Sequence, residues 1–375
     1  MKIDGIRMRG GSAFHKDLRK RVDAYFEEAG VDPYGDGRMW RKTATLLGGF
    51  ALLLAGFWLS DGGWAAILGF GIPLGLFWAG LGFSVMHDGN HAAYSRDKRV
   101  NRGMGFVLDM IGGSSYLWRH KHNRIHHSHP NVVGVDDDLE AGFFLRMAPS
   151  QDWLPMHRFQ QWYMWPLYGF IAIKWHLMDD YAQLMRGHIN DVPFARPKGR
   201  DLAEFVVGKI IFHTWCIVVP ALLFGIGTAV AFWLLGAFVC GIMLAVVFQL
   251  AHCVEEADFI VPPTDGERIE LDWAELQLAT TVDFARDNPL ATWYLGGLNF
   301  QVVHHLFPRV CHVHYRKMAD IVEATAADHG LRYRCNPTVG GALASHFNWM
   351  RRMGLEPGSA AEASPVDARP EPVLR

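Results

Sequence analysis

IIFHTWCIVVPALLFGIGTAVAFWLLGAFVCGIMLAVVFQLAHCV, residues 210–254, contains no Asp, Glu, Lys or Arg. A helix needs about 20 apolar residues to cross a hydrocarbon core about 30 Å thick, and this stretch is about twice that long. It therefore predicts two spanning helices, at 205–226 and 228–253, joined by a turn near Gly225 and Gly227.

A second apolar stretch lies between Lys42 and Arg96, and its first charged residue is Asp61. It predicts another pair of spanning helices, at 43–60 and 64–86, which turn at Asp61 and the two glycines after it. Two buried helical hairpins in a large soluble core are the alternative, but stretches of this length favour a membrane. Together the two hairpins predict an all-α membrane protein with four transmembrane helices.

The composition narrows the class of protein. Of the 375 residues, 50% are hydrophobic and 13% aromatic, which excludes a disordered or fibrous chain. The formal net charge of −2 argues against nucleic acid as the main partner, because that partner needs a basic surface. Cys216 and Cys240 fall inside expected helices, and Cys253, at a helix end, is expected to face a reducing cytosol together with Cys311 and Cys335, so no disulfide framework is predicted.

Basic residues indicate the orientation in the membrane. Neither expected turn contains Lys or Arg, whereas the N-terminal segment carries Lys16, Arg19, Lys20, Arg21, Arg41 and Lys42. The positive-inside rule then places 1–42, 87–204 and the residues after 253 on the cytoplasmic side. The first forty residues contain no apolar stretch that would resemble a secretory signal. Residues 346–375 are expected to form a C-terminal tail that is disordered at its end.

Histidines follow the expected membrane exits on that side. They occur in the strings HDGNH (87–91), HNRIHH (122–127), QLAH (249–252) and QVVHH (301–305). On a helix, residues four apart share one face and adjacent residues diverge by about 100°, so one string can serve two neighbouring metals. Neutral imidazole suits Zn, Cu, Fe and Ni. Eight such side chains exceed what one metal can take, and they predict a binuclear site.

Other metal and cofactor chemistries fit the sequence less well. It contains no H-E-x-x-H string, no paired C-x-x-C and no Glu followed three residues later by His. The glycines at 69, 71 and 75 fall inside an apolar helix, where close packing is their expected role. The chain therefore shows no nicotinamide or flavin motif of its own, and electrons for a redox reaction must come from outside.

The three strings HDGNH, HNRIHH and QVVHH, in this order around a hydrophobic hairpin, resemble the histidine boxes of the integral-membrane fatty acid desaturases. Gln301 replaces the first His of the third box, as in the front-end and linoleoyl-CoA-desaturase-like branch. Val303 departs from that branch, whose usual third box reads QIEHH. The resemblance covers about residues 40–345, which makes 43–345 the expected desaturase domain.

The resemblance implies four transmembrane helices and a helical cytosolic cap that holds a di-iron centre. Such an enzyme uses O2 and two electrons from a ferredoxin or cytochrome b5-type donor to introduce a cis double bond into an acyl chain. The acyl chain of the substrate would be attached to coenzyme A or to a lipid. The implied iron ligands are His87, His91, His122, His126, His127, His252, His304 and His305.

Other polar residues near the boxes are candidates for supporting roles. Gln301 is expected either to bind a metal or to hydrogen-bond to a ligand. Metal-bound His usually donates its second N–H to a carboxylate or carbonyl. Possible ligands or ligand partners are Gln301, Asp88, Asn123, Asp138 and Glu256, and a solvated surface charge is the alternative for each acid. His120 and His129 break the box spacing, and His312 and His314 are expected at the surface or as helix caps.

Two rival functions remain open from the sequence. A hydroxylase on the same di-iron scaffold would share the first hydrogen abstraction. A membrane metal-binding or transport protein would use the same histidines without redox turnover. The expected spans are nearly free of ionisable residues, which argues against an ion pathway.

Overall fold

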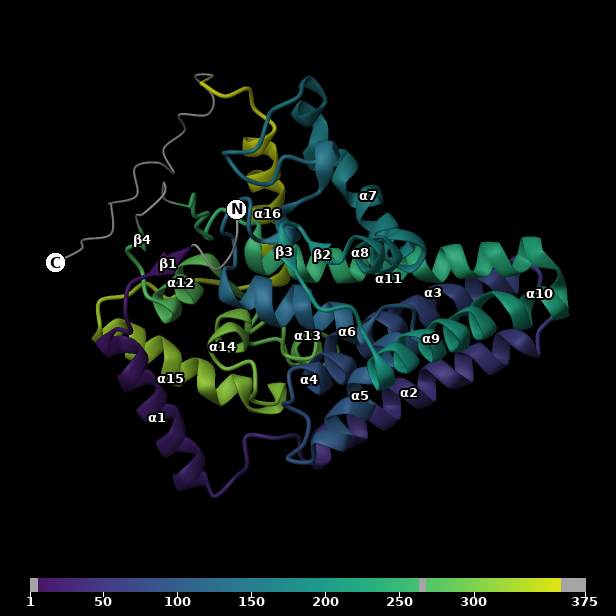
Figure 1. The fold of residues 1–375 in the computed structure, drawn as a ribbon, viewed down its shortest axis with the longest axis horizontal. Coiled ribbons are helices and arrows are strands. Elements are labelled where there is room, and N and C mark those ends of the chain that lie inside the picture. Colours follow the sequence, from purple (N-terminus) through teal and green to yellow (C-terminus); the bar gives the residue numbers. More distant parts are fainter. Residues whose placement is uncertain (1–5, 263–267, 359–375) are drawn as a thin grey trace.

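Long helical segments lie side by side in an elongated bundle, which a computed structural model describes together with the rest of residues 6–262 and 268–358 (Figure 1). α11 packs against α3 and α7, and α2 packs against α3. The segments are α2 (Gly37–Trp58), α3 (Trp64–Leu81) with the π-helical turn Gly82–Met86 and α4 (His87–Asn90), α7 (Gln160–Lys174), α9 (Gly199–His213) with the π-helical turn Thr214–Val218 and α10 (Val219–Phe224), and α11 (Ile226–His252).

Both expected hairpins exist as pairs of helices, although their limits differ. The turn of the second hairpin is the single residue Gly225, whose φ of 87° suits glycine, and Ile226 already begins α11. In the first hairpin the second helix continues past 86 to Asn90. The apolar pattern ends at 86 because it indicates only which residues lie in an apolar environment. Backbone hydrogen bonds continue the helix by another turn into polar residues.

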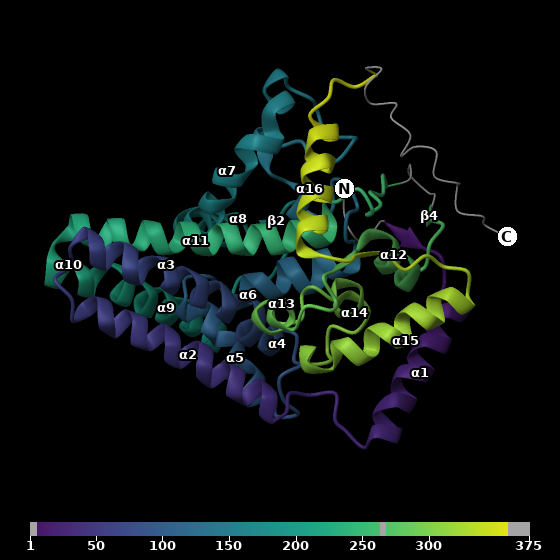
Figure 2. The same cartoon turned by 180° about the vertical axis from the view of Figure 1, so that it is seen from behind.

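Three helices of the described chain are long and apolar enough to cross a membrane: Trp64–Asn90, Gly199–Phe224 and Ile226–His252. α2 is not among them. Its apolar part follows Arg41 and Lys42, which lower the mean hydropathy of the helix. It nevertheless runs alongside α3 in the bundle (Figure 2).

A group of shorter helices, α1, α12, α14 and α15, covers the end of the bundle opposite α10 and is called the cap below (Figures 1 and 2). α1 (Ala13–Ala29) packs on α15 (Tyr315–Asp328) and α12 (Trp273–Thr280), and α14 (Gln301–Leu306) packs on both of these. The buried residues of α1 are Phe14, Leu18 and Val22, four apart, which turns one face of the helix to the cap core.

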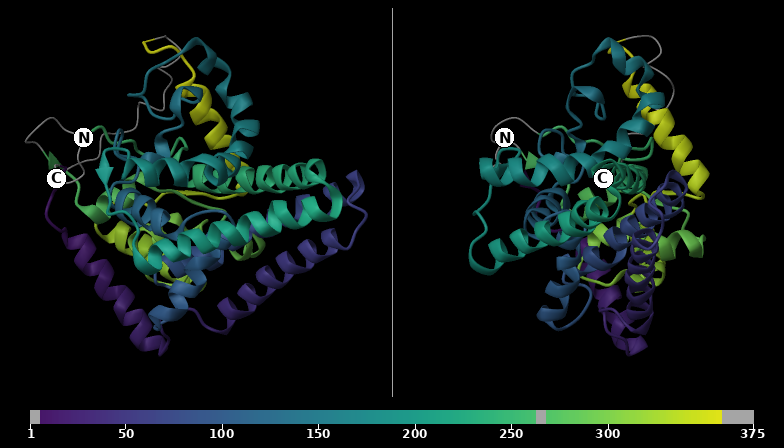
Figure 3. Two further views of the ribbon diagram at one scale, coloured as in Figure 1. Left: turned by 45° about the vertical axis from the view of Figure 1, so that its right-hand side comes forward. Right: turned by 90° about the vertical axis from the view of Figure 1, so that its right-hand side faces the viewer.

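The other elements connect the bundle and the cap. α16 packs against α7 and α11, and it lies along one side of the bundle in the end-on view (Figure 3, yellow). The helices are α5 (Lys98–Met110), α6 (Ser115–Trp118), α8 (Asp180–Arg186), α13 (Pro289–Tyr294) and α16 (Val339–Met353), with π-helical turns at Arg119–Ile125 and Trp175–Asp179. Short 3₁₀ turns occur at His126–Ser128, Asp137–Leu139, Gly142–Phe144, Pro155–Phe159 and His312–His314.

Of the three short strand pairs in the described residues, two join distant segments and the third is a local hairpin. β1 (Arg7–Met8) is parallel to β4 (Arg268–Ile269), β2 (His188–Ile189) is antiparallel to β3 (Val192–Pro193), and β5 (Asp283–Phe284) is parallel to β6 (Cys335–Asn336). The domain limits expected at 42 and 345 fall within α2 and α16. Of the C-terminal tail expected at 346–375, residues 346–353 are the last part of α16, and 359–375 lie outside the described residues.

Candidate metal centre

The histidine boxes meet where the bundle joins the cap, because each box lies at or just beyond a helix end. The first box continues α3 as α4, and His252 is the last residue of α11. The second box occupies the π-helical turn Arg119–Ile125 and the 3₁₀ turn after it, and the third box forms α14. Segments that lie far apart in the sequence therefore bring their imidazoles to one place.

The imidazoles form two adjoining groups. In the first, ligand atoms of His87, His91, His122 and His304 all lie within 4.8 Å of one another. In the second, His126, His252 and His305 lie within the same distance. His127 is grouped with His304 and His305, one from each group. All eight side chains are buried.

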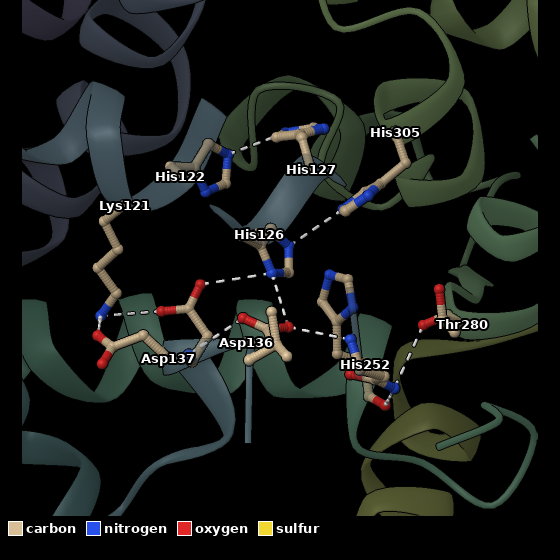
Figure 4. Close-up of polar contacts among 12 residues, drawn as sticks. Lys121, His122, His126, His127, Asp136, Asp137, His252, Thr280 and His305 are labelled. Atoms are coloured by element: carbon tan, nitrogen blue, oxygen red, sulfur yellow. Dashed lines mark hydrogen bonds and ion pairs between the residues drawn. The ribbon is translucent and has the colours of Figure 1, made fainter. Parts of the chain in front are cut away.

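The distances between ring nitrogens match those expected of ligands on a shared metal. Nε2 of His126 lies 3.3 Å from Nε2 of His305, and Nε2 of His127 lies 3.2 Å from Nε2 of His122 (Figure 4). Two nitrogens bound about 2.1 Å from one metal at ordinary coordination angles lie roughly 3.0 to 3.4 Å apart.

The hydrogen bonds leave bare nitrogens in the second group. His126 donates from Nδ1 to Asp136 Oδ2 at 3.0 Å, and His305 donates from Nδ1 to Gln277 Oε1 at 2.9 Å. Because these oxygens only accept, Nε2 of each ring carries a lone pair when the ring is neutral, and the two lone pairs then face each other. A cation between them removes the repulsion.

The first group also holds nitrogens without partners. His87, His91 and His304 each keep a buried Nε2 atom that has no hydrogen bond among the described residues. A buried polar atom left without a partner costs free energy, so such atoms are rarely left in a folded protein. Convergent bare imidazole nitrogens are the donors that a transition metal prefers, and the residues of both groups therefore fit metal ions.

Burial favours the neutral form that binds metals. It lowers the pKa of His122, His127, His304 and His305 well below the ordinary value, and the neighbouring imidazoles lower it further. His126 differs, because the effect of burial is outweighed by Asp136, and the pKa of the ring is raised. Its Nδ1–H is thus held firmly by the carboxylate.

Gln301 lies against the second group. Its Nε2 is 3.0 Å from His252 Nε2 and 3.2 Å from His305 Nε2, and the side chain is 3% exposed. The amide therefore faces the same space as the imidazoles, where it could either bind a metal or hydrogen-bond to a ligand.

The acidic and amide residues expected near the ligands lie at different distances from them. Asp138 lies 3.5 Å from His126 Nδ1 and pairs with Lys121. Asn123 donates to the carbonyl of Asn90. Glu256 instead accepts hydrogen bonds from Ser345 at 2.5 Å and from Asn336 at 3.1 Å.

A buried chain of charged and polar groups leads to His87. Lys42 Nζ donates to His312 Nε2 at 2.7 Å, and His312 Nδ1 donates to Asp88 Oδ2 at 2.8 Å. The other oxygen of Asp88 lies 3.5 Å from His87 Nδ1. The expectation that His312 lies at the surface or caps a helix is wrong, because the chain after the third box folds back over the first box and buries this ring.

Several supporting residues were not identified from the sequence. Gln277 accepts a hydrogen bond from Nδ1 of His305, and the hydroxyl of Tyr315 lies 3.2 Å from Nδ1 of His304. Lys42 is the first residue of the hydrogen-bonded chain that leads to His87. They lie in segments without a motif, so no signal marked them. His120 and His129 lie outside both imidazole groups, as their spacing suggested.

A cavity of about 900 Å³ opens beside both groups. Its wall includes Trp118, which stacks on His122 at 4.3 Å between ring centroids, and Phe248, which stacks on His252 at 4.7 Å. Most of the remaining lining is apolar and comes from the π-helical turn Gly82–Met86, the segment 141–147, α7 and α11. The lining also includes five carboxylates and two lysines: Asp137, Asp138, Glu140, Asp179, Asp180, Lys121 and Lys174. The cavity thus combines an apolar body with a polar region.

A model of the family described as fatty acid desaturase matches residues 62–337. The chain belongs to the fatty acid desaturase family. Among curated relatives, the sn-1 linoleoyl-lipid 6-desaturase of Arthrospira platensis is 36% identical over 356 residues, 93% of this chain and 94% of the relative. The protein of the same name from Synechocystis sp. is 35% identical, over 94% of this chain and 99% of the relative.

The similarity extends to desaturases of eukaryotes. The acyl-lipid (8-3)-desaturase of Physcomitrium patens is 35% identical over 91% of this chain and 72% of the relative. The resemblance carried by the three histidine boxes is therefore confirmed, and this desaturase is an oxidoreductase that forms unsaturated fatty acids.

Proposed function

We propose that this desaturase is a membrane-bound, non-haem di-iron enzyme that introduces a cis double bond into the acyl chain of a lipid. It would use O2 and two electrons from a separate donor protein. The observation that carries the proposal is the pair of adjoining imidazole groups, with their bare and convergent nitrogens, beside an apolar cavity.

The proposed ligands divide between two metals. His87, His91, His122 and His304 would hold one iron, and His126, His252 and His305 would hold the other, with His127 between them and Gln301 beside the second. When bound, the irons would supply the O2 activation that breaking an unactivated C–H bond requires. Zinc has no redox chemistry and fits the family's activity less well.

The proposed reaction balances in atoms and electrons. The acyl chain loses two hydrogen atoms, that is, two protons and two electrons, as the –CH2–CH2– unit becomes –CH=CH–. O2 takes these two electrons, two more from the donor protein, the two substrate hydrogens and two protons, and two water molecules form. The apolar wall of the cavity would orient the acyl chain and keep bulk water away, with Trp118 and Phe248 packed beside the imidazoles at its inner end.

A lipid carrier fits the polar region of the cavity better than coenzyme A. Five carboxylates line the cavity, and three lysines pair with four of them: Lys121 with Asp137 and Asp138 at 2.9 Å, Lys174 with Asp179 at 2.7 Å and Lys209 with Asp180 at 2.6 Å. Among the described residues, the lining therefore keeps an excess of negative charge and no unpaired lysine. Coenzyme A carries several phosphate charges, which such a surface would repel. The names of the relatives, linoleoyl-lipid and acyl-lipid desaturases, support the same choice.

The proposed topology follows from the charge pattern of the sequence. α2 would be the fourth span, completed by its apolar C-terminal part, and the two turns would lie outside the cell. The metal centre, the segment 1–42 and the C-terminal residues would face the cytoplasm, where a ferredoxin or cytochrome b5-type donor supplies electrons.

Product analysis tests the proposal. The protein is expressed with a ferredoxin and its reductase in a host whose membrane lipids contain linoleoyl chains, and the fatty acids of each lipid class are identified. We expect a new cis-unsaturated acid esterified in lipids, and none with His126→Ala. A hydroxylated acid would favour the oxygenase, and product that appears first in the acyl-CoA pool would contradict the lipid carrier.

A further inference from the structure

Trp273 connects the cap surface to the metal centre. It is the first residue of α12 and is only half-buried. Its indole N–H donates to the backbone carbonyl of His127 at 3.1 Å, and the ring of His127 belongs to the imidazoles of the centre. One aromatic side chain thus touches both the solvent-facing cap and a proposed ligand.

The N-terminal part of α1 is fixed beside Trp273. The rings of His15 and Trp273 lie 5.5 Å apart. Ser12 N–H donates to Asp272 at 2.5 Å, and Arg9 pairs with Glu275 at 2.5 Å, so both residues before α1 are tied to the first turn of α12. The position of this part of α1 relative to Trp273 is therefore set by several contacts.

This part of α1 is basic. Lys16, Arg19 and Lys20 are exposed, and they make no ion pair within the described chain. They line a shallow hollow, and Asp23 and Glu27 line its continuation towards the end of the helix. Arg21 is different, since Asp17 and Asp328 neutralise it. The surface formed by the first part of α1 therefore carries three positive charges that are not in ion pairs, and the carboxylates of Asp23 and Glu27 lie towards its other end.

We propose that an acidic one-electron carrier protein docks on the basic face formed by Lys16, Arg19 and Lys20, and that Trp273 carries its electrons towards the metal centre. The proposal rests on the proposed function, which needs two electrons per double bond. Each docked carrier is oxidised by one electron and the centre is reduced by one, so two carriers act in turn. Trp273 is unchanged at the end.

Charge reversal tests the docking surface. The probe is a plant-type [2Fe–2S] ferredoxin, and its affinity for the detergent-solubilised holoenzyme is measured at several salt concentrations. We expect the K16E/K20E variant to bind it at least about tenfold more weakly, and wild-type binding to weaken as salt rises. The matched control is K98E/R99E, which makes the same charge change on exposed residues of α5 and should keep wild-type affinity.

Two outcomes would overturn the docking proposal: equal weakening by both double variants, or no binding by the wild-type protein at low salt. Affinity for ferredoxin is measured without turnover, so this result is separate from the fate of the proposed function. A protein that holds no iron and forms no product would refute the function, whereas an active enzyme whose K16E/K20E variant binds ferredoxin normally would refute the docking site alone.

Substitution of the indole tests the path. In Trp273→Phe an aromatic ring remains but the bond to His127 is lost, and we expect ferredoxin to reduce the metal centre several-fold more slowly in stopped-flow experiments. Dithionite with a small viologen mediator should reduce it at the wild-type rate. Trp153→Phe is the control, because Trp153 makes the same kind of bond to the carbonyl of Gly354, at 2.9 Å. Unchanged ferredoxin-driven reduction in Trp273→Phe would overturn the path.

Discussion

Three of the eight imidazoles in the two groups have a partner at Nδ1, the nitrogen that faces away from the proposed metals. Asp136 holds His126, Gln277 holds His305 and Tyr315 contacts His304. Such partners fix the ring orientation and the position of the proton, and their loss typically weakens metal binding or activity 10- to 100-fold. The arrangement explains how bare nitrogens are kept convergent in a buried site.

Removal of a proposed ligand should be more severe than removal of a partner. We expect His305→Ala to lower desaturase activity by more than about 100-fold and to reduce bound iron, because the second group keeps only two imidazoles. His120→Ala removes an imidazole outside both groups and should retain activity and iron. Measurement of iron and product in membranes from both variants checks the prediction, and an active His305→Ala enzyme would contradict the ligand assignment.

His312 is a positioning residue in this account, since it acts through Asp88 on His87. We expect His312→Ala to lower activity roughly 10- to 100-fold and to alter the spectrum of the metal centre. His312→Gln, which can still donate to Asp88 and accept from Lys42, should restore much of both. The control is His314→Ala, because His314 is equally buried in the same turn but bonds to the carbonyl of Tyr34. Equal losses in the two alanine variants would refute the role.

Sequence spacing predicted the residues of the imidazole groups and, in Asp88 and Asp138, two acids that lie 3.5 Å from a proposed ligand. It did not predict Gln277, Tyr315 or Lys42. The boxes are local patterns, so the spacing of His122, His126 and His127 can be recognised within one short stretch of sequence. Gln277 and Lys42 reach the centre through contacts between segments far apart in the chain, and no local pattern marks such contacts.

At the scale of elements, α14 is held in place by one buried carboxylate. Asp283 accepts from the backbone N–H of Val302 at 2.9 Å and from the hydroxyl of Tyr333. It thereby fixes the first turn of the short helix that carries His304 and His305. Burial raises the pKa of Asp283 to about 7, against hydrogen bonds that lower it.

Because the pKa of Asp283 is raised, its contribution to the stability of the folded protein falls as the pH rises. Asp has a pKa of about 3.9 in an unfolded chain, so between about pH 4 and 7 the folded protein holds the proton more tightly than the unfolded one. The stability contributed by Asp283 is present below about pH 4 and is lost as the pH rises through about 7. Asp283→Asn should therefore lose less thermal stability between pH 5 and 8 than the wild-type protein does.

Thermal unfolding of the solubilised protein at these two pH values checks the prediction. Asp320→Asn serves as the control, because Asp320 is exposed on α15 and pairs there with Arg286. It should show the wild-type change between pH 5 and 8. An Asp283→Asn variant with the full wild-type change would contradict the assignment.

The long helices could be predicted because their length and apolar composition are properties of one continuous stretch of sequence. The helices predicted at 205–226 and 228–253 are observed as the continuous segment Gly199–Phe224 and as α11, Ile226–His252. The cap was not predictable in this way. α12 and α14 are short, and their positions depend on packing against α1 and α15 rather than on their own pattern.

At the scale of the whole molecule, the cavity links the bundle to the metal centre. Ala245 on α11 lies in its wall and is 4% exposed. Ala245→Phe should narrow the cavity and lower activity on long acyl chains by at least about tenfold, while iron content stays unchanged, because the substitution fills space that the acyl chain needs. Overpacking at such a position costs about 1–3 kcal/mol of stability, so the folded yield is measured as well.

Leu234→Phe is the matched control, since Leu234 lies on the same helix and is 38% exposed. It should retain activity. Normal activity of Ala245→Phe, with a folded protein and full iron, would show that the acyl chain binds elsewhere.

The central claim is that the two imidazole groups hold two irons. The most direct test is the number of iron atoms per chain in protein purified under anaerobic conditions from cells grown with ⁵⁷Fe, with the Mössbauer spectrum recorded on the same sample. We predict two irons per chain in nitrogen-rich sites, and a loss of iron from His305→Ala but not from His120→Ala. A fully active desaturase with one iron per chain, or with none, would contradict the account.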